Sequence, residues 1–484
     1  MMAKLSPTTW SDRMTRGAVG RMAELAFRRP LTAVAAVAFV PRILLAVFVN
    51  RADIWSLAPD SVQYLAITEA AVDGRLATFW FGYGESLFQA TRTFTLQIFL
   101  LFEIFGPSRL AVQCVAVLYG VLAAVLTVVV ARRLVRPGYA LGAGLVVALL
   151  PSQIAFSSAA IRESLIWCLL ALTIFFVLRS GQSERVLGSI GWMVATAVPI
   201  FLMSYLRVHS ALLITWCLIG GLRLKGRTRL VRSLAVVLLV VLLPVSMGMG
   251  PGGVEYASAS AKGLGTVRAV LAMSADSAIG SGDRTPCAEC LQMPATVDSS
   301  RVLCEVGCDV SSLLPGDILQ RVMDLDAANQ KFIVDAEGRY FMLDNDLEAT
   351  LANFPHGLVS VTLRPFPWEA DGGFGRTAAA LESPIWLLLI LLSVVGIVAK
   401  WRSSDEVILL MVQVALFTGA AAVTQGNLGT AFRHRGQVLV ALAALSMVGM
   451  EHLRDRRSRN GMDKGGGQGM SQEQEGHVDY LESL

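Results

Sequence analysis

Residues 109–131 read RLAVQCVAVLYGVLAAVLTVVVA, and Arg132 and Arg133 follow directly. After the leading Arg109, this stretch contains no charged side chain up to residue 131. At a rise of about 1.5 Å per residue, roughly 20 apolar residues cross the hydrocarbon core of a bilayer. The stretch therefore predicts a transmembrane helix that ends at a basic membrane boundary.

Apolar stretches of this kind recur along the chain. Of its 484 residues, 54% are hydrophobic and only 16% are charged, whereas soluble domains are about one quarter charged. This balance predicts an all-α polytopic membrane protein. We expect about ten transmembrane helices, at residues 31–49, 109–131, 138–157, 161–179, 188–206, 209–223, 233–250, 384–400, 405–425 and 436–452.

Basic side chains indicate how these helices are oriented, because cytoplasmic loops are enriched in Lys and Arg. With ten helices, the dense basic clusters all fall on one side: Arg13–Arg29, Arg132–Arg136, Arg223–Arg232, Lys400–Arg402 and Arg454–Arg459. We therefore expect a multi-pass protein of the bacterial plasma (inner) membrane with both termini in the cytoplasm. The first helix is read as a signal anchor that is retained. The expected parts are a cytoplasmic segment (1–30), a membrane domain (31–250), an insert (251–383), a three-helix bundle (384–452) and a disordered tail (453–484).

Two regions are expected on the outer side. The first is a loop at 50–108, in which Phe94–Phe105 lies along the membrane interface. The second is the insert at 251–383, read as a small α/β domain. It contains a hairpin at Lys331–Leu343 and helices at 310–330 and 344–353.

Four cysteines lie in the insert, with the spacing Cys-x-x-Cys, thirteen residues, Cys-x-x-x-Cys: Cys287, Cys290, Cys304 and Cys308. Outside the cytoplasm, such a set predicts two disulfides. A zinc knuckle is the alternative. Either arrangement would stabilise the insert and take no part in the chemistry, so we expect no catalytic metal.

Arg42 lies inside the first apolar stretch. A charged residue at membrane depth is costly and usually faces a functional site within the bundle. Alternatively, the side chain extends toward the outer interface, because Arg42 lies beyond the midpoint of the helix.

Further cationic residues lie in very short outer loops, where the topology does not explain them: Arg162, Arg207, His209, Arg433, His434 and Arg435. A guanidinium matches the geometry of a phosphate and can bind it through two N–H groups. Together with Arg42, these residues are our candidates for binding a lipid phosphate. The alternative is that they pair with Glu163, Asp60 or Glu69 and hold the loops together.

Asp60 opens the first outer loop, in the string APDSVQYLAITE. A carboxylate here can accept the proton of an acceptor hydroxyl as a general base. Asp60 is also well placed to cap a helix running to Val72, since Asp is favoured at helix starts. Glu69 is a second candidate for the catalytic carboxylate.

The order of these features resembles a known family. An Arg lies in the first helix, Pro-Asp-Ser-x-x-Tyr opens the outer loop, and Phe-Gly-Pro-Ser-Arg precedes a helix that ends in Arg-Arg. Leu-Pro-Ser-Gln-Ile-Ala-Phe-Ser-Ser and Arg-Glu-Ser follow. Over residues 30–225, this order resembles the GT-C membrane glycosyltransferases, relatives of the protein mannosyltransferases that use polyprenyl-phosphate sugars. The resemblance implies that the first outer loop supplies the catalytic carboxylate, here Asp60.

A second, narrower resemblance lies near the C-terminus. The string GNLGTAFRHR at 426–435, with RPFPWE upstream, is similar to multi-span proteins encoded among bacterial exopolysaccharide genes. Both resemblances imply transfer of a sugar from a polyprenyl-phosphate donor to a cell-surface glycan, lipid or protein. We expect no required cofactor, although a divalent cation is possible, and no nucleic-acid partner. The alternatives are a polysaccharide polymerase or ligase, a transporter of lipid-linked glycans and a non-catalytic assembly partner.

Overall fold

The structure, a computed structural model, describes residues 29–52, 60–76, 83–183, 185–221, 332–334, 340–342, 347–369, 374–424 and 428–465. The described helices begin with those of the N-terminal half: α3 (Pro30–Arg51), α4 (Asp60–Val72), α5 (Tyr83–Ala90), α6 (Arg92–Phe105), α7 (Arg109–Ala131), α8 (Pro137–Leu149), α9 (Pro151–Ser157), α10 (Glu163–Gln182), α11 (Val186–Ser204) and α12 (Val208–Gly221). The remaining described elements are β1 (Phe332–Val334), β2 (Tyr340–Met342), α17 (Leu347–Thr362), the 3-10 turn η5 (Pro367–Glu369), α18 (Phe374–Lys400), α19 (Asp405–Thr424) and α20 (Leu428–Gly465).

The chain is an all-α polytopic membrane protein. Within the described ranges, seven helices are long and apolar enough to cross a membrane, or eight if the bent pair α8–α9 counts as one span. The sequence-based expectation of about ten included α12, whose apolar segment is shorter than a span, and residues 233–250, which lie outside the described residues.

The expected single helix at 138–157 is in fact broken. α8 and α9 meet at an angle of 57°, on either side of Leu150 and Pro151. Proline lacks the N–H that a continuous helix needs, and its ring disfavours helical geometry in the preceding residue. The break is therefore encoded locally.

The insert is described only in part. β1 and β2 pair in antiparallel fashion, with Ile333 opposite Phe341, which confirms the predicted hairpin. The helix expected at 344–353 begins at Leu347 and extends further, to Thr362. The helix expected at 310–330 and the four cysteines, Cys287, Cys290, Cys304 and Cys308, lie outside the described residues.

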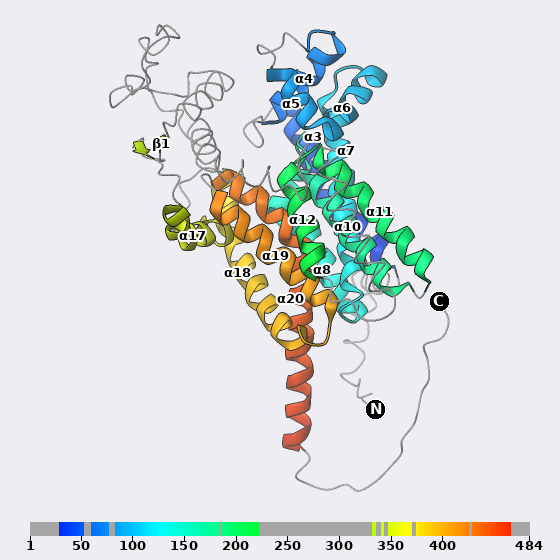
Figure 1. Ribbon diagram of the computed structural model, residues 1–484, viewed down its shortest axis with the longest axis vertical. Coiled ribbons are helices and arrows are strands. Elements are labelled where there is room, and N and C mark those ends of the chain that lie inside the picture. The colour runs from blue at the N-terminus through cyan, green and yellow to red at the C-terminus, as the bar shows by residue number, and fades with distance from the viewer. Residues whose placement is uncertain are drawn as a thin grey trace, which may run out of the picture.

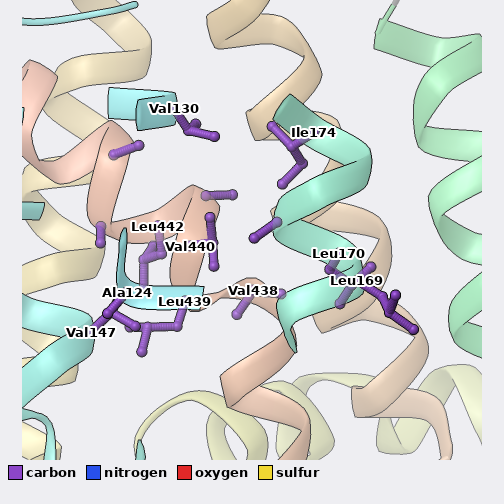
Figure 2. Close-up of a cluster of buried hydrophobic side chains, with 14 of the residues drawn as sticks. Ala124, Val130, Val147, Leu169, Leu170, Ile174, Val438, Leu439, Val440 and Leu442 are labelled. Atoms are coloured by element: carbon purple, nitrogen blue, oxygen red, sulfur yellow. The ribbon is translucent and has the colours of Figure 1, made fainter. Parts of the chain in front are cut away.

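Helix α20 forms the centre of the bundle. Within its apolar segment 83% of the residues are buried, against 28% for α3, which therefore lies on the outside of the bundle. Figure 2 shows side chains of α20 meeting those of α7, α8 and α10: Ala124, Val130, Val147, Leu169, Leu170, Ile174, Val438, Leu439, Val440 and Leu442. Gly396 of α18 and Gly449 of α20 lie so close to the facing backbone that a Cβ atom would clash there. Small residues at such crossings let membrane helices pack tightly.

Helix α20 also projects from the lower end of the bundle (Figure 1). It continues to Gly465, so the predicted disorder of residues 453–484 is wrong for 453–465. Arg136 explains the start of this extension, since it pairs with Glu451 and Asp455 on successive turns of α20.

Helices α4, α5 and α6 lie together at the upper end of the bundle (Figure 1). One face of α6 is buried through Phe94, Ile98 and Phe102, and its exposed face carries Leu96 and Leu100. Since both faces are apolar, α6 fits between the bundle and lipid. This arrangement suits the predicted interfacial position of Phe94–Phe105.

Candidate active site

Side chains from several helices meet at one end of the bundle. Asp60 lies in the first turn of α4, and Arg433 lies near the start of α20. Arg162 directly precedes α10, and Arg207 lies in the turn between α11 and α12. Ion pairs and electrostatic interactions connect these residues, and we define the arginine cluster as Asp60, Tyr64, Arg162, Glu163, Arg207 and Arg433.

Arg433 pairs directly with Asp60. The Nη1 group of Arg433 donates to Oδ2 of Asp60 across 373 positions of sequence. The Asp60 side chain is 39% exposed, whereas that of Arg433 is 16% exposed. Arg433 also lies over the ring of Phe156 at 5.8 Å, and its buried Nε has no hydrogen-bond partner.

Arg207 pairs with Glu163 in a more buried setting. The Nη2 group of Arg207 lies 3.3 Å from Oε1 of Glu163, and the two side chains are 14% and 4% exposed. Burial, together with the charge of neighbouring Arg162, lowers the pKa of Arg207 to about 10. The guanidinium therefore stays charged at neutral pH, and its Nη1 has no hydrogen-bond partner.

Arg162 completes the cationic side of the cluster. Its Nη1 donates to the carbonyl oxygen of Leu206 at 2.7 Å, while its Nε has no hydrogen-bond partner. Arg162 lies 5.8 Å from the centre of the Tyr64 ring. Tyr64 packs edge-on against Phe94, and burial raises the pKa of its hydroxyl to about 12. Tyr64 is therefore a neutral wall of the cluster.

The cluster carries an excess of positive charge. Three arginines and two carboxylates sum to 3 − 2 = +1, with Tyr64 neutral. Each arginine keeps a buried nitrogen without a partner: Nε of Arg162, Nη1 of Arg207 and Nε of Arg433. Buried N–H groups are nearly always satisfied in native proteins. An anionic ligand that brings acceptor oxygens would complete this arrangement.

The two histidines lie beside the cluster. His434 interacts electrostatically with Arg207, His209, Arg433 and Arg162, and His209 interacts with Arg207 and Arg162. Both candidates are thus near the residues with which sequence reasoning grouped them. Whether they bind a phosphate stays a prediction.

Arg42 serves a different structural purpose. Its Nη1 and Nη2 donate to the carbonyl oxygens of Ala148 at 2.6 Å and Val147 at 3.0 Å, at the end of α8. Nη1 also donates to Ala38, and Nε donates to Ser157. A cation at a helix C-terminus balances the helix dipole and its unpaired carbonyls. We therefore leave Arg42 out of the candidate active site.

Arg435 caps a second helix in the same way. Its Nε donates to the carbonyl oxygen of Val361, and its Nη2 donates to those of Ser360 and Arg364, around the end of α17. Successive helical residues are about 100° apart, so Arg433 and Arg435 leave α20 about 200° apart. The two arginines that we grouped from the sequence are therefore separated by the helix that carries them.

Glu69 is also separated from the cluster. It lies 69 − 60 = 9 residues after Asp60 on the same helix, which places it about 13 Å further along and on the opposite face. Its side chain is exposed. The structure therefore does not bring the two predicted carboxylates together.

The break between α8 and α9 is capped from both sides. Arg42 caps the end of α8, and Glu382 of α18 accepts from the backbone N–H and the hydroxyl of Ser152 at the start of α9, both at 2.7 Å. Trp386 donates to the same carboxylate at 2.6 Å. An anion at a helix N-terminus complements the cation at the neighbouring C-terminus. Arg42 and Glu382 thus fix α9, which carries Phe156 under Arg433.

Sequence reasoning noted Tyr64 only as part of the Pro-Asp-Ser-x-x-Tyr string and treated Glu163 only as a pairing partner. It did not single out Glu382. Tyr64 could have been found, since it lies four residues after Asp60 and on the same helix face. Glu382 could not, because its partner Ser152 is 230 positions away. Within the described ranges, no group of three His, Cys, Asp or Glu side chains is placed to hold a metal ion.

Comparisons with known proteins found little. No family model matches the chain, and no curated protein matches it. Among solved structures, it is similar to the crystal structure of ArnT from Cupriavidus metallidurans in the apo state, at 15% identity. The match covers 88% of this chain and 78% of that one, with a TM-score of 0.32. A likeness at this level carries no conclusion about activity, which we argue from the site alone.

Proposed function

We propose that this protein is a membrane glycosyltransferase that uses a polyprenyl-phosphate sugar as its donor. The acceptor would be a cell-surface glycan, lipid or protein at the outer leaflet of the bacterial inner membrane. One observation carries the proposal: three arginines with unpaired N–H groups lie together at one end of a transmembrane bundle, and one of them, Arg433, pairs with the accessible carboxylate of Asp60.

A phosphate fits the arginine cluster better than a carboxylate ligand. It presents more oxygens than a carboxylate, and guanidinium groups bind such oxygens through paired N–H groups. The phosphodiester of a polyprenyl-phosphate sugar carries one negative charge, which would balance the excess of +1. In the proposed complex, the polyprenyl chain stays in the bilayer and its phosphate lies in the cluster.

Asp60 is the better general base of the two carboxylates. Its side chain is 39% exposed, whereas that of Glu163 is 4% exposed, so an acceptor hydroxyl can reach Asp60. The hydroxyl oxygen attacks the anomeric carbon as its proton passes to Asp60. The bond between that carbon and the phosphate oxygen breaks, and polyprenyl phosphate leaves with the bonding electrons. This displacement inverts the anomeric configuration.

The arginines would stabilise the charge that develops on the departing phosphate. Fixed donors aimed at a developing charge accelerate such reactions, because they need little reorganisation. Arg162, Arg207 and Arg433 are held by helix termini and by partners from other helices. A transporter is expected to carry charged residues along the interior of several helices. The sequence offered only Arg42 for that role, and its position as a helix cap accounts for it without transport.

The test uses the full chain in lipid nanodiscs, incubated with labelled polyprenyl-phosphate sugars and candidate acceptors. We expect the label to move to an acceptor and polyprenyl phosphate to be released in equal amount, with Asp60→Asn as the inactive control. A chelator arm tests whether a divalent cation is needed. Transfer that is the same in Asp60→Asn as in the wild type would overturn the mechanism.

A further inference from the structure

We propose that Asp60 and the donor phosphate compete for Arg433, so that Asp60 is released as a base only when the donor is bound. The inference rests on the proposed function and adds an order of events to it. It starts from the ion pair between Nη1 of Arg433 and Oδ2 of Asp60. In this ion pair, Asp60, the proposed base, and Arg433, a proposed phosphate ligand, bind each other.

A carboxylate oxygen that accepts from a guanidinium has one lone pair engaged by that N–H. In the ion pair, Asp60 is therefore less available to an acceptor hydroxyl, although its side chain remains 39% exposed. Arg433 for its part has a buried Nε without a partner. A phosphate that binds the guanidinium through two N–H groups would use this Nε and draw Arg433 away from Asp60.

The second ion pair shows why it is the Asp60 pair that opens. Glu163 is 4% exposed and Arg207 is 14% exposed, so separating them would leave a buried carboxylate without a partner. Breaking a pair of this kind is strongly unfavourable. Asp60, by contrast, can turn toward solvent when Arg433 moves to the phosphate. The difference in exposure thus indicates that Glu163 keeps its ion pair with Arg207, whereas Asp60 gives up Arg433 to the phosphate.

The charge balance is compatible with this exchange. With Asp60 engaged, the empty cluster keeps an excess of +1. When Asp60 turns away, the three arginines and Glu163 leave 3 − 1 = +2, so the bound phosphodiester is held by a net positive site. Asp60 then retains its negative charge beside the acceptor, without its former cationic partner. Donor binding would therefore precede activation of the acceptor hydroxyl.

The experiment measures binding of a polyprenyl monophosphate to the full chain in nanodiscs, because this probe carries the phosphate and the lipid but no transferable sugar. Asp60→Asn removes the competing charge, so we expect it to bind the probe about two- to fivefold more tightly than the wild type, the range expected for a partly exposed ion pair. Arg433→Ala should bind it much more weakly. Most variants of a binding site weaken binding, so a gain is diagnostic.

The matched control is Glu69→Gln, which removes one negative charge from the same helix but lies outside the cluster. It should bind the probe as the wild type does, which separates local competition from a general change in charge. Asp60→Ser serves as a second variant if Asp60→Asn is poorly folded, and it should show the same gain.

The outcomes separate the two proposals. If Asp60→Asn binds the probe no more tightly, or if Glu69→Gln shows the same gain, competition for Arg433 is wrong. If Asp60→Asn has also lost transfer in that case, the glycosyltransferase proposal stands. If Asp60→Asn keeps full transfer, Asp60 is not the base, and the release of Asp60 by the donor is wrong whatever the binding data show. The glycosyltransferase proposal itself fails only if the wild type transfers no sugar from any of the labelled donors.

Discussion

Two sets of buried arginines in this bundle look alike in the sequence and differ in their partners. Arg42 and Arg435 donate mainly to backbone carbonyls at the ends of α8 and α17. Arg162, Arg207 and Arg433 face one another and two carboxylates. Each of the three keeps a buried nitrogen without a partner, as Arg435 also does at its Nη1. The first set completes the backbone hydrogen bonding of broken or short helices. The second set gathers three cations and two carboxylates in one place, which leaves an excess of positive charge.

The difference teaches that a charge inside a membrane domain is not by itself a sign of function. Where a helix ends within the bundle, its last carbonyls lack partners, and water is scarce. An arginine is then the least costly way to satisfy several carbonyls at once. A functional arginine is recognised by its company: further cations and an accessible carboxylate lie beside it, and backbone carbonyls are not its main partners.

The largest effect that this comparison predicts falls on Asp60. Replacing Asp60 with Asn should reduce transfer by about 10²- to 10⁴-fold, the usual loss when a general base is removed. Folding should be preserved, because Asn is also favoured at a helix start. The measurement is the transfer rate at saturating donor, with thermal unfolding of both proteins as the control. A variant that kept its rate would return Asp60 to a purely structural role.

The next effect separates the capping arginines from the cluster. Arg42→Met should destabilise the protein by on the order of 3 kcal/mol, because it leaves the carbonyls of Val147 and Ala148 without their donor. The fraction that remains folded should bind the donor as the wild type does. Unfolding in detergent and donor binding at low temperature test the two parts. Weaker donor binding by a fully folded Arg42→Met protein would place Arg42 back in the site.

Arg433 should give the opposite pattern to Arg42, with the loss in donor binding and not in stability. Arg433→Ala should weaken donor binding by about 10- to 150-fold, the range for a hydrogen bond to a charged group. Arg433→Lys should recover only part of this loss, since an ammonium lacks the planar fork. Titration with donor in nanodiscs measures both. Equal binding by the Lys variant and the wild type would mean that the charge alone matters.

Much of the fold could be predicted from the sequence, because a transmembrane helix is a local property of some 20 residues. The run at 109–131 matches α7 closely, and the hairpin in the insert was predicted from its turn and its apolar strands. The break between α8 and α9 was missed even though Pro151 signals it locally. The sequence was interpreted as one helix because the apolar stretch is long enough to span a membrane, and Pro151 was not taken as a break.

The division of roles among the arginines could not be predicted, because each role depends on a distant partner. Arg42 reaches Val147 across 105 positions, and Arg433 reaches Asp60 across 373. The packing of α3 against α8 brings Arg42 to a carbonyl, and the meeting of Asp60 on α4 with Arg433 on α20 brings Arg433 to a carboxylate. Helical periodicity would have separated Arg433 from Arg435, and it would have placed Glu69 away from Asp60.

The smallest predicted effect tests whether Arg162 belongs fully to the second set. Its Nη1 donates to Leu206, as a structural arginine would, but its Nε has no hydrogen-bond partner, and Arg207 and Arg433 likewise each keep one unpaired nitrogen. Arg162→Lys keeps the charge and can keep the bond to Leu206, so it removes little beyond the open N–H. If that N–H binds the donor, the affinity should fall by about 2- to 12-fold, the value of one ordinary hydrogen bond. Combining this change with Arg433→Lys should give a loss that differs from the product of the single losses, because residues that contact one phosphate are coupled. An unchanged affinity in Arg162→Lys, together with independent effects in the double variant, would move Arg162 to the structural set and leave Arg207 and Arg433 as the donor-binding pair.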